Sequence, residues 1–450
     1  MKPPSSCSSQ TVLETLTTPV ENVGDVLVIG AGSAGIAAAL AAARSGAKTM
    51  LIDPAGFPGG TLVSGLAILG CHDGEKQVVR GLFQEMVDRL RARDGVEGDP
   101  AETTAINVDV EKLKILLLEM LHEAGVELRL HTVFARAEME GRRIRAAVVE
   151  GKGGRTALAA SQYIDTTGDA DLALSAGVPV EKGRKRDGRV QPMTMMFAVG
   201  NIDKAAFAAW GGYPALEKLY CEVATREDFR NPRRANLSCI WGPSSRTGEF
   251  AFNVTRVLES DGSDARSLSR AEIEGRLQVW EFMEQFLKPH VPGFARSYIV
   301  WTAAKIGVRE TRRIVGEYVI TRDDIWDFVK FPDVINCGSY PIDIHSPTDA
   351  TTEFPMDHFY GGKYWTIPYR ALVPLEVDNL MVAGRCLSAT HEAMAAVRCM
   401  ANTIGMGEAA GFAAALSARG GVQPRSLDYR DVQRALLKHG GWLGEVELNP

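Results

Sequence analysis

The sequence lacks the cysteine spacing of a disulfide reductase or an iron–sulfur protein. Its seven cysteines are scattered along the chain, and no two of them form a C-x-x-C motif. This argues against thiol–disulfide chemistry, against cysteine-ligated clusters and against an oxidising compartment. Each cysteine is expected to pack as a small buried side chain. His391-Glu392 begins like the zinc motif H-E-x-x-H, but residue 395 is alanine, so no metal site is predicted.

Long apolar runs and an excess of positive charge are also missing. No apolar stretch reaches the length of a bilayer span, and residues 1–23 are rich in Ser, Thr and Pro without the apolar core of a signal peptide. The formal net charge of −6 gives no general electrostatic case for nucleic acid or an anionic membrane. With 450 residues, 45% of them hydrophobic, the chain can bury a large core, and we expect a cytoplasmic enzyme with a loosely ordered N-terminal tail.

The most informative segment is residues 25–53, which read DVLVIGAGSAGIAAALAAARSGAKTMLID. An apolar strand at 26–29 leads into a glycine turn and an alanine-rich helix, and a second strand at 48–52 ends at Asp53. Strand, turn, helix and terminal acid in this order are typical of the βαβ unit that binds a dinucleotide.

Each glycine of the turn has a steric role in such a unit. Gly30 permits the tight turn, Gly32 lets the backbone approach a pyrophosphate, and Gly35 lets the helix pack closely against the strand. The pyrophosphate is expected at the helix N-terminus, where unpaired N–H groups and the helix dipole favour negative charge. Asp53 stands eighteen residues after Gly35 and suits the adenosine ribose of either NAD or FAD.

A second nucleotide-like segment lies far downstream. Residues 377–385 form an apolar strand with its own glycine turn, and an Ala/Gly-rich helix follows at 405–411. Directly after Asp53, residues 54–61 form a turn with little side-chain bulk that can pass along a long cofactor. Two separated segments of this kind favour one extended cofactor.

Several short motifs accompany these segments: GGT at 59–61, DTTGD at 165–169, GVRETRR at 307–313, IPYR at 367–370, AGR at 383–385 and SATHEA at 388–393. With them, residues 24 to about 417 resemble the FAD-dependent oxidoreductase family of the glutathione-reductase fold group, in its fumarate-reductase-like branch without a redox disulfide. The resemblance implies FAD as the cofactor and leaves the substrate open. The family often has Glu where this chain has Asp53, and either carboxylate can bond a ribose.

The resemblance and the motifs together predict the residues that hold FAD. The DTTGD turn is expected near the adenosine end. The helix that begins within 402–406 is expected against the flavin, where its N–H groups can stabilise the anion formed on reduction. The glycines of that helix, at 405, 407 and 411, can equally serve close packing. The predicted cofactor-binding residues are Gly30, Gly32, Ser33, Ala34, Gly35, Asp53, Pro54, Gly59, Gly60, Thr61, Val133, Thr167, Gly168, Asp169, Gly384, Arg385, Thr403, Met406 and Gly407.

The positions of the nucleotide segments predict an α/β fold, in which a Rossmann-like FAD-binding domain with a parallel sheet is interleaved with a second, α+β substrate domain. The active site is expected in the cleft between the two domains. The predicted parts are a flexible N-terminal tail (1–23), the first part of the FAD domain (24–185), a substrate or cap domain (186–365), the second part of the FAD domain (366–420) and a C-terminal helical extension (421–450).

Local patterns predict further elements of these domains. Thr321 and Asp324 have the spacing of a capping box that starts a helix. Helices are expected at 77–90, 111–123 and 271–286, and strands at 127–134, 143–150, 249–254 and 317–321.

Three residues are candidates for acid, base or substrate-orienting roles. His391 follows the AGR turn in a loop that, by the resemblance, faces the isoalloxazine, so we interpret it as an active-site group, with a structural histidine as the alternative. His345 and Arg309 are further candidates. Arg309 and Glu310 can instead form an internal ion pair that holds the second domain, which is the preferred interpretation, with a substrate clamp as the alternative.

The sequence therefore predicts an FAD-dependent dehydrogenase or reductase that transfers hydride between a small polar organic substrate and flavin N5, with an external electron acceptor or donor. No separate nicotinamide domain is visible. One alternative is a flavin monooxygenase or halogenase, because residues 364–368 are similar to the W-x-W-x-I-P signature of halogenases, although Lys363 replaces the first tryptophan. A second alternative is a flavin-binding electron-transfer subunit of a larger complex. The oligomeric state is left open, with a homodimer as one option.

Overall fold

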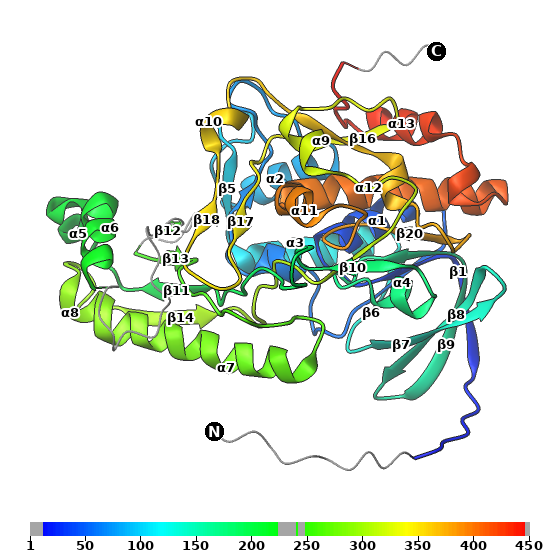
Figure 1. Cartoon of the computed structure of the whole chain (residues 1–450), viewed down its shortest axis with the longest axis horizontal. Coiled ribbons are helices and arrows are strands. Elements are labelled where there is room, and N and C mark those ends of the chain that lie inside the picture. The colour runs from blue at the N-terminus through cyan, green and yellow to red at the C-terminus, as the bar shows by residue number, and fades with distance from the viewer. Residues whose placement is uncertain (1–11, 224–239, 242–247, 446–450) are drawn as a thin grey trace.

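Two sheets and a layer of helices organise the protein (Figure 1). The structure is a computed structural model that describes residues 12–223, 240–241 and 248–445, so Cys7, Cys239 and residues 1–11 of the predicted N-terminal tail lie outside the described residues. The larger sheet has seven strands and the main smaller sheet has four. The predicted α/β class with a parallel, Rossmann-like sheet is confirmed.

The larger sheet has the order β6-β2-β1-β9-β8-β7, and β20 also pairs with β9. Strands β6, β2, β1, β9 and β20 are parallel to one another, whereas β8 and β7 add to them in antiparallel fashion. The strand of the second nucleotide segment therefore lies next to β9, which itself pairs with the strand of the first segment. These strands are β1 (Val20–Ile29), β2 (Thr49–Ile52), β6 (Glu127–Arg129), β7 (Val133–Glu140), β8 (Arg143–Gly151), β9 (Gly154–Asp165) and β20 (Leu380–Val382).

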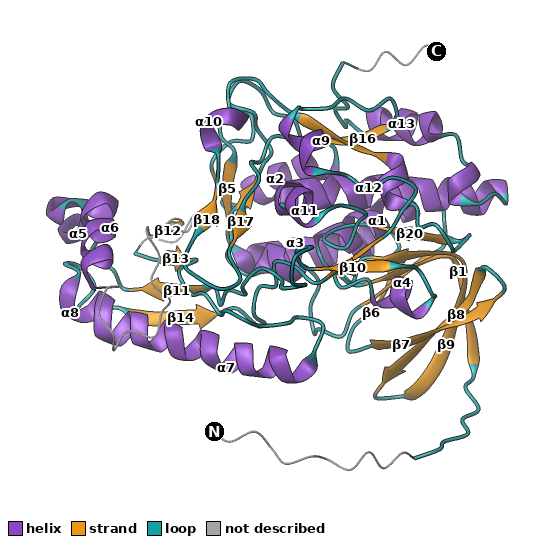
Figure 2. Cartoon of the chain, in the orientation of Figure 1, coloured by secondary structure: helices purple, strands orange, loops and turns teal. Residues whose placement is uncertain are grey.

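The apolar run in β1 is continuous because the sheet is covered on both faces. Val26 and Val28 pack with the helices of one face, and Leu27 and Ile29 pack on the other face with the short helix α4 (Asp171–Ser175). Figure 2 shows α1 and α12 crossing the centre of the molecule next to the sheet. The main helices are α1 (Ser33–Arg44), α2 (Leu82–Arg91), α3 (Val110–Glu123), α11 (His391–Val397), α12 (Met400–Gly420) and α13 (Tyr429–Lys438).

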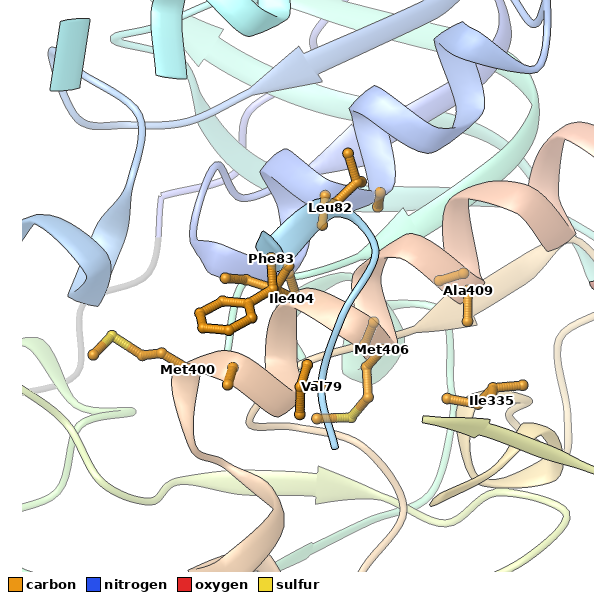
Figure 3. Packing of buried hydrophobic residues seen from close by; sticks show 14 of the residues in the cluster. Val79, Leu82, Phe83, Ile335, Met400, Ile404, Met406 and Ala409 are labelled. Carbon is orange, nitrogen blue, oxygen red and sulfur yellow. The ribbon is translucent and has the colours of Figure 1, made fainter. Parts of the chain in front are cut away.

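Helices α1 and α12 pack unusually closely because small residues face each other. A Cβ atom on Gly407 would lie 2.1 Å from the carbonyl oxygen of Ala34, and one on Gly411 would lie 2.2 Å from that of Ala38. Only glycine fits at these two positions. Helix α2 closes the same apolar layer, and Figure 3 draws its Phe83 close to Ile404 of α12.

The smaller sheet has the order β12-β13-β11-β14 and forms a second core with a long helix and its π-helical extension. Phe197 and Phe252 stack at 5.2 Å between ring centroids, and Phe282 packs edge-on against both. The predicted helix at 271–286 is therefore α7 plus this extension. The elements are β11 (Phe197–Gly200), α5 (Lys204–Trp210), α6 (Gly212–Val223), β12 (Ile240–Trp241), β13 (Phe250–Phe252), α7 (Ala265–Glu281), η2 (Phe282–Leu287), α8 (Lys288–His290) and β14 (Tyr298–Thr302).

Short elements connect the two cores. The antiparallel pair β10–β15 carries the chain from one core to the other. None of the helices in the described ranges is long and apolar enough to cross a membrane. The remaining elements are η1 (Gly60–Val63), β3 (Ile68–Leu69), β4 (Val96–Glu97), β5 (Ala105–Val108), β10 (Val180–Lys182), β15 (Arg312–Ile314), α9 (Arg322–Trp326), β16 (Val334–Gly338), β17 (Ile344–His345), β18 (Thr352–Glu353), α10 (Met356–Phe359), β19 (Trp365–Pro368), η3 (Tyr369–Leu372) and η4 (Pro424–Ser426).

Several predicted boundaries need correction. Residues 20–23 belong to the sheet rather than to a flexible tail, because β1 begins at Val20 and pairs there with β9. The single strand predicted at 127–134 is two strands, since His131 adopts a positive φ of 53° and turns the chain between them. The strand predicted at 317–321 is reduced to isolated bridges at Gly316 and Ile320, and the helix predicted at 77–90 begins only at Leu82.

Other local predictions agree with the structure. The helix at 111–123 is α3, and the strands at 143–150 and 249–254 correspond to β8 and β13. The capping box is confirmed, because the Thr321 side chain accepts the backbone N–H of Asp324 while the Asp324 carboxylate accepts that of Thr321.

Candidate functional site

The glycine turn between β1 and α1 has the shape that its sequence predicts. Gly30 adopts φ of 103°, and a Cβ atom there would lie 2.6 Å from the carbonyl oxygen of Thr166. A Cβ atom on Gly35 would lie 1.8 Å from the carbonyl oxygen of Gly30. Gly32 differs, because a Cβ atom there would have no described atom within 4 Å outside the adjoining residues of its own chain segment. Open space therefore adjoins the start of α1.

The start of α1 has the properties of an anion site. Gly32 is the N-cap and supplies no side-chain acceptor, and no acidic residue lies in the first turn of this helix. The GGT loop forms the opposite wall: the Gly59 N–H donates to the Ala31 carbonyl at 2.8 Å, and a Cβ atom on Gly60 would lie 3.0 Å from Gly32 Cα. Uncapped N–H groups beside open space, lined by glycine, fit a pyrophosphate.

Asp53 holds this turn from the end of β2. Its carboxylate accepts the N–H of Ala31 at 2.6 Å and that of Ala55 at 2.8 Å, and the residue is 8% exposed. A carboxylate has about four acceptor sites, so the same group retains capacity for a ribose hydroxyl. Pro54 follows directly. Val133, at the start of β7, is 51% exposed and follows Thr132, whose backbone N–H donates to the Asp53 carbonyl at 3.0 Å.

The DTTGD and AGR turns meet at the carboxyl ends of β9 and β20. Asp169 accepts from the Thr311 hydroxyl and from the Arg385 guanidinium, both at 2.7 Å, and Arg385 also donates to Thr311 at 2.8 Å. The nearby Thr167 donates its hydroxyl to Asp165 at 2.8 Å. Gly168 has φ of 78°, so a side chain there would be strained, and it lies against the Arg385 guanidinium. Gly384, with φ of 95°, approaches Ala34 of α1.

The start of α12 lies beside the start of α1. Helix α12 begins at Met400, before the predicted window of 402–406, and its N-cap makes no side-chain capping bond. The hydroxyl oxygens of Ser33 and Thr403 lie 2.6 Å apart. Met406 and Gly407 are fully buried in the packing of α12, and Thr61 lies in η1 beside the glycine turn. The structure thus gathers residues from all the predicted cofactor segments, while their contacts with a cofactor stay predictions.

A cluster of titratable residues adjoins this region. His391 is buried as the first residue of α11, capped by Thr390, and does not lie in a loop as predicted. Its Nδ1 lies 2.8 Å from Oε1 of Glu310, which is fully buried. Glu310 also accepts from Arg313 at 2.5 Å and from the backbone N–H of Gln191 at 3.0 Å. The predicted ion pair between Arg309 and Glu310 is therefore wrong.

Arg309 and Glu310 have different partners, although they are adjacent in the chain. The Arg309 guanidinium donates to the Pro192 carbonyl at 2.8 Å and to the Thr194 hydroxyl at 2.5 Å. Both partners lie in the segment that leads into β11 of the smaller sheet. Three consecutive residues of the GVRETRR segment thus contact three different places. Arg309 contacts the segment before the smaller sheet, Glu310 contacts His391, and Thr311 contacts Asp169.

His345 belongs to a neighbouring polar group. It is buried, and its Nε2 lies 3.1 Å from Oδ1 of Asp343. Burial and then the positive charge of Arg309 lower the pKa of His345 to about 3, so its imidazole is neutral at physiological pH. Burial alone would raise the pKa of Asp343, but the hydrogen bond with His345 and the positive charges of Arg398 and Arg309 hold it below its ordinary value.

Gln191 joins this group to the Glu310 cluster and was missed by sequence reasoning. Its side-chain oxygen accepts from the Arg398 guanidinium at 3.2 Å and from the backbone N–H of His345 at 3.1 Å. Its amide nitrogen is buried and has no hydrogen-bond partner among the described residues. No local motif marks Gln191 or Arg398, because their role depends on which segments meet. Glu310 did carry a signal, since it lies in the GVRETRR motif.

The described cysteines form no disulfide with one another, and burial raises the pKa of Cys71 to about 12. Within 12–223 and 248–445, no three His, Cys, Asp or Glu side chains gather as a metal site would require. Trp365, which lies in the halogenase-like segment, is fully buried in β19, where its indole N–H donates to the Tyr340 carbonyl at 3.1 Å.

Comparison with known proteins identifies the family. Residues 25–436 match the protein family described as FAD dependent oxidoreductase. The chain belongs to this family. FAD is accordingly the cofactor of this oxidoreductase, and the uncapped start of α1, the open space at Gly32 and the acceptor capacity of Asp53 fit that group.

Individual relatives are distant from this flavoprotein or cover little of it. Over 73 residues it is 41% identical to the sarcosine oxidase subunit alpha of Rhizobium meliloti (strain 1021), which is 16% of this chain and 7% of that subunit. A geranylgeranyl bacteriochlorophyll reductase-like protein of Thermoplasma acidophilum has a TM-score of 0.48 and 14% identity, over 94% of this chain and 84% of the other. The p-nitrophenol 4-monooxygenase PnpA of Pseudomonas putida DLL-E4 has a TM-score of 0.45 and 12% identity, over 93% of this chain and 85% of the other.

Proposed function

We propose that this oxidoreductase is a dehydrogenase or reductase that transfers hydride between a small polar organic substrate and N5 of its flavin, with an external electron acceptor or donor. The observation that carries the proposal is the pair of adjacent residues Glu310 and Thr311. One contacts the histidine of α11 and the other contacts Asp169 and Arg385. A titratable imidazole and the proposed cofactor residues are therefore held by one short segment.

The residues that would hold FAD come from both nucleotide segments. The first turn of α1, with Gly32, Ser33 and Ala34, would bind the pyrophosphate together with the loop of Gly59, Gly60 and Thr61. Asp53 would bind the adenosine ribose, with Pro54 and Val133 beside the adenine. Thr167, Gly168 and Asp169 of the DTTGD turn would lie near the adenosine end, with Gly384 and Arg385 beside them. Thr403 and the uncapped start of α12 would meet the flavin, while Met406 and Gly407 support that helix. Bound FAD supplies the hydride acceptor or donor.

His391 would exchange a proton with the substrate. Its Nδ1 is engaged by Glu310, and within the described part of the chain no hydrogen bond occupies its Nε2. An imidazole with one nitrogen held and the other available suits general acid–base catalysis. His345 is a weaker choice for this role, because burial and Arg309 lower its pKa to about 3 and so make its imidazole a poor proton acceptor. It would serve to orient the substrate together with Arg309.

A polar substrate is supported by the side chain of Gln191. Its buried amide group has two N–H donors without a partner among the described residues, and such groups normally bind a ligand or water. Arg398 and Arg309 lie in the same region. A substrate with a carbonyl, hydroxyl or carboxylate oxygen would supply the acceptor that this amide lacks.

Anaerobic reduction tests the proposal. The purified protein is mixed without oxygen with a panel of small hydroxy acids, amino acids and amines, and loss of the visible flavin absorbance is followed; oxygen, a quinone or NAD(P)⁺ is then added. Bleaching by a panel member alone, with reoxidation by an added acceptor, is expected. Bleaching only by NAD(P)H, with oxygen then entering an aromatic product, would replace this proposal with a monooxygenase. Bleaching only by another protein would indicate an electron-transfer subunit.

A further inference from the structure

We infer that Glu310 is a positioning residue that keeps the proton of the neutral His391 imidazole on Nδ1, so that Nε2 carries the lone pair that meets the substrate. The role of Nε2 as the proton acceptor in the reaction rests on the proposed function. The tautomer itself can be measured independently of any activity.

The contact between Glu310 and His391 determines which nitrogen holds the proton. Oε1 of Glu310 and Nδ1 of His391 are 2.8 Å apart, and both residues are buried. An ionised carboxylate can only accept hydrogen bonds, so the imidazole must be the donor. In a neutral imidazole with the proton on Nδ1, the other nitrogen is an acceptor.

Arg313 and Gln191 make this arrangement independent of the state of His391. Arg313 donates to the same Oε1 at 2.5 Å, and the backbone N–H of Gln191 donates to Oε2 at 3.0 Å. Arg313 is itself fixed by the carbonyls of Ala389 at 2.8 Å and Gly183 at 3.1 Å. A buried carboxylate is stable only when paired, and Glu310 remains paired with Arg313 whether or not the imidazole is charged.

The same contact helps the imidazole to take up a proton. In the direction of substrate oxidation, the substrate loses hydride from carbon to the bound cofactor and loses the proton of its hydroxyl or amine to Nε2 of His391. The imidazolium that results donates from Nδ1 to a carboxylate, and this bond becomes charge-assisted and therefore stronger. Glu310 is thus expected to favour the protonated product state without touching the substrate.

The first measurement uses the folded wild type. Nitrogen NMR of the protein with ¹⁵N-labelled histidine reports the tautomer of each ring, and the signals of His391 are assigned by their loss in His391→Ala. A proton on Nδ1 is expected for the neutral ring. A proton on Nε2 would overturn the inference, whether or not the proposed reaction is correct.

Variants then test the consequence for the reaction. Glu310→Gln is expected to slow substrate-driven flavin reduction at least about 100-fold and to change the His391 ring signals. Glu310→Asp should recover part of the rate. Asp333→Asn is the matched control: it removes a buried carboxylate that pairs with Arg370 at 2.9 Å elsewhere, and it should lower the melting temperature without altering the rate per bound flavin.

The outcomes separate the two hypotheses. If Glu310→Gln lowers only the melting temperature, as the control does, Glu310 is structural and the inference fails. If Glu310→Gln does not fold, the ring signals of the wild type and of Glu310→Asp decide. If His391→Ala reduces at the wild-type rate, the proposed role of His391 fails, while the tautomer measurement still tests the contact with Glu310.

Discussion

The hydroxyl oxygens of Ser33 and Thr403 lie 2.6 Å apart, although 370 residues separate them in the sequence. Ser33 begins the helix of the first nucleotide segment, and Thr403 lies in the first turn of the helix that follows the second. Two helix N-termini, each with partial positive charge, therefore converge on one region. This convergence is what a single extended, anionic cofactor requires.

Substitution of Gly32 by Val is expected to abolish FAD retention while leaving the fold intact. Space for the side chain exists in the protein itself, because no described atom outside the adjoining residues lies within 4 Å of the Cβ position, and the added methyl groups would occupy the place proposed for the pyrophosphate. The visible flavin absorbance per chain, after gel filtration, measures the effect.

A matched control is Gly153→Val, at another glycine whose Cβ position has no described atom within 4 Å outside the adjoining residues, in the turn between β8 and β9. This variant should keep its flavin. Full FAD occupancy in a folded Gly32→Val protein would show that the cofactor does not pass this turn.

Replacement of Cys71, Cys386 and Cys399 together by Ala is expected to leave flavin reduction within roughly tenfold of the wild-type rate. Burial raises the pKa of all three thiols, that of Cys71 to about 12, so none supplies a thiolate at neutral pH. Stopped-flow reduction, normalised to bound FAD, is the measurement. Loss of reduction in a variant that still binds FAD would mean that a thiol takes part.

His391→Ala is expected to slow the reductive half-reaction about 10² to 10⁴-fold, the range typical for loss of a general acid or base, while FAD stays bound. The control is His358→Ala, which removes an imidazole stacked on Trp326 at 4.0 Å between ring centroids. That change should lower the melting temperature and leave the rate per flavin unchanged. The same result for both variants would assign His391 to packing alone.

Glu408 is expected to make stability fall as pH rises from about 4.5 to about 8. Burial raises the pKa of this carboxyl from 4.5 to about 8, although the Leu82 N–H and Arg44 oppose the effect. Within that window the folded protein holds a proton that the unfolded chain has lost, so each pH unit costs at most about 1.4 kcal/mol. Below pH 4.5 both states hold the proton and this cost disappears.

Glu408→Gln tests this by urea unfolding between pH 5 and pH 8. The amide oxygen can still accept from the Leu82 N–H, which lies 3.1 Å from the carboxyl oxygen in the wild type, and the pH dependence due to this residue should vanish. Glu97→Gln, which removes the same formal charge from an exposed position, should retain the wild-type slope. A slope that is unchanged in Glu408→Gln would show that another group causes it.

The sequence by itself determined the parts of the fold that local sterics dictate. Gly30 adopts a positive φ of 103° to turn the strand into the helix, and a Cβ atom on Gly35 would clash with the carbonyl oxygen of Gly30, five residues earlier. The capping box of Thr321 and Asp324 likewise depends on three consecutive peptide bonds and was correct. Such features are readable because every atom involved lies close by in the chain.

Only the tertiary structure decided how the proposed catalytic residues are paired. Arg309 and Glu310 are adjacent, yet Arg309 donates to the Pro192 carbonyl, whereas Glu310 meets His391 and Arg313. The pairing of β20 with β9 places the second nucleotide segment beside the first, and that contact depends on hydrogen bonds between strands far apart in the chain. Side-chain direction and long-range strand order follow from the packing of the whole molecule, and no local pattern contains them.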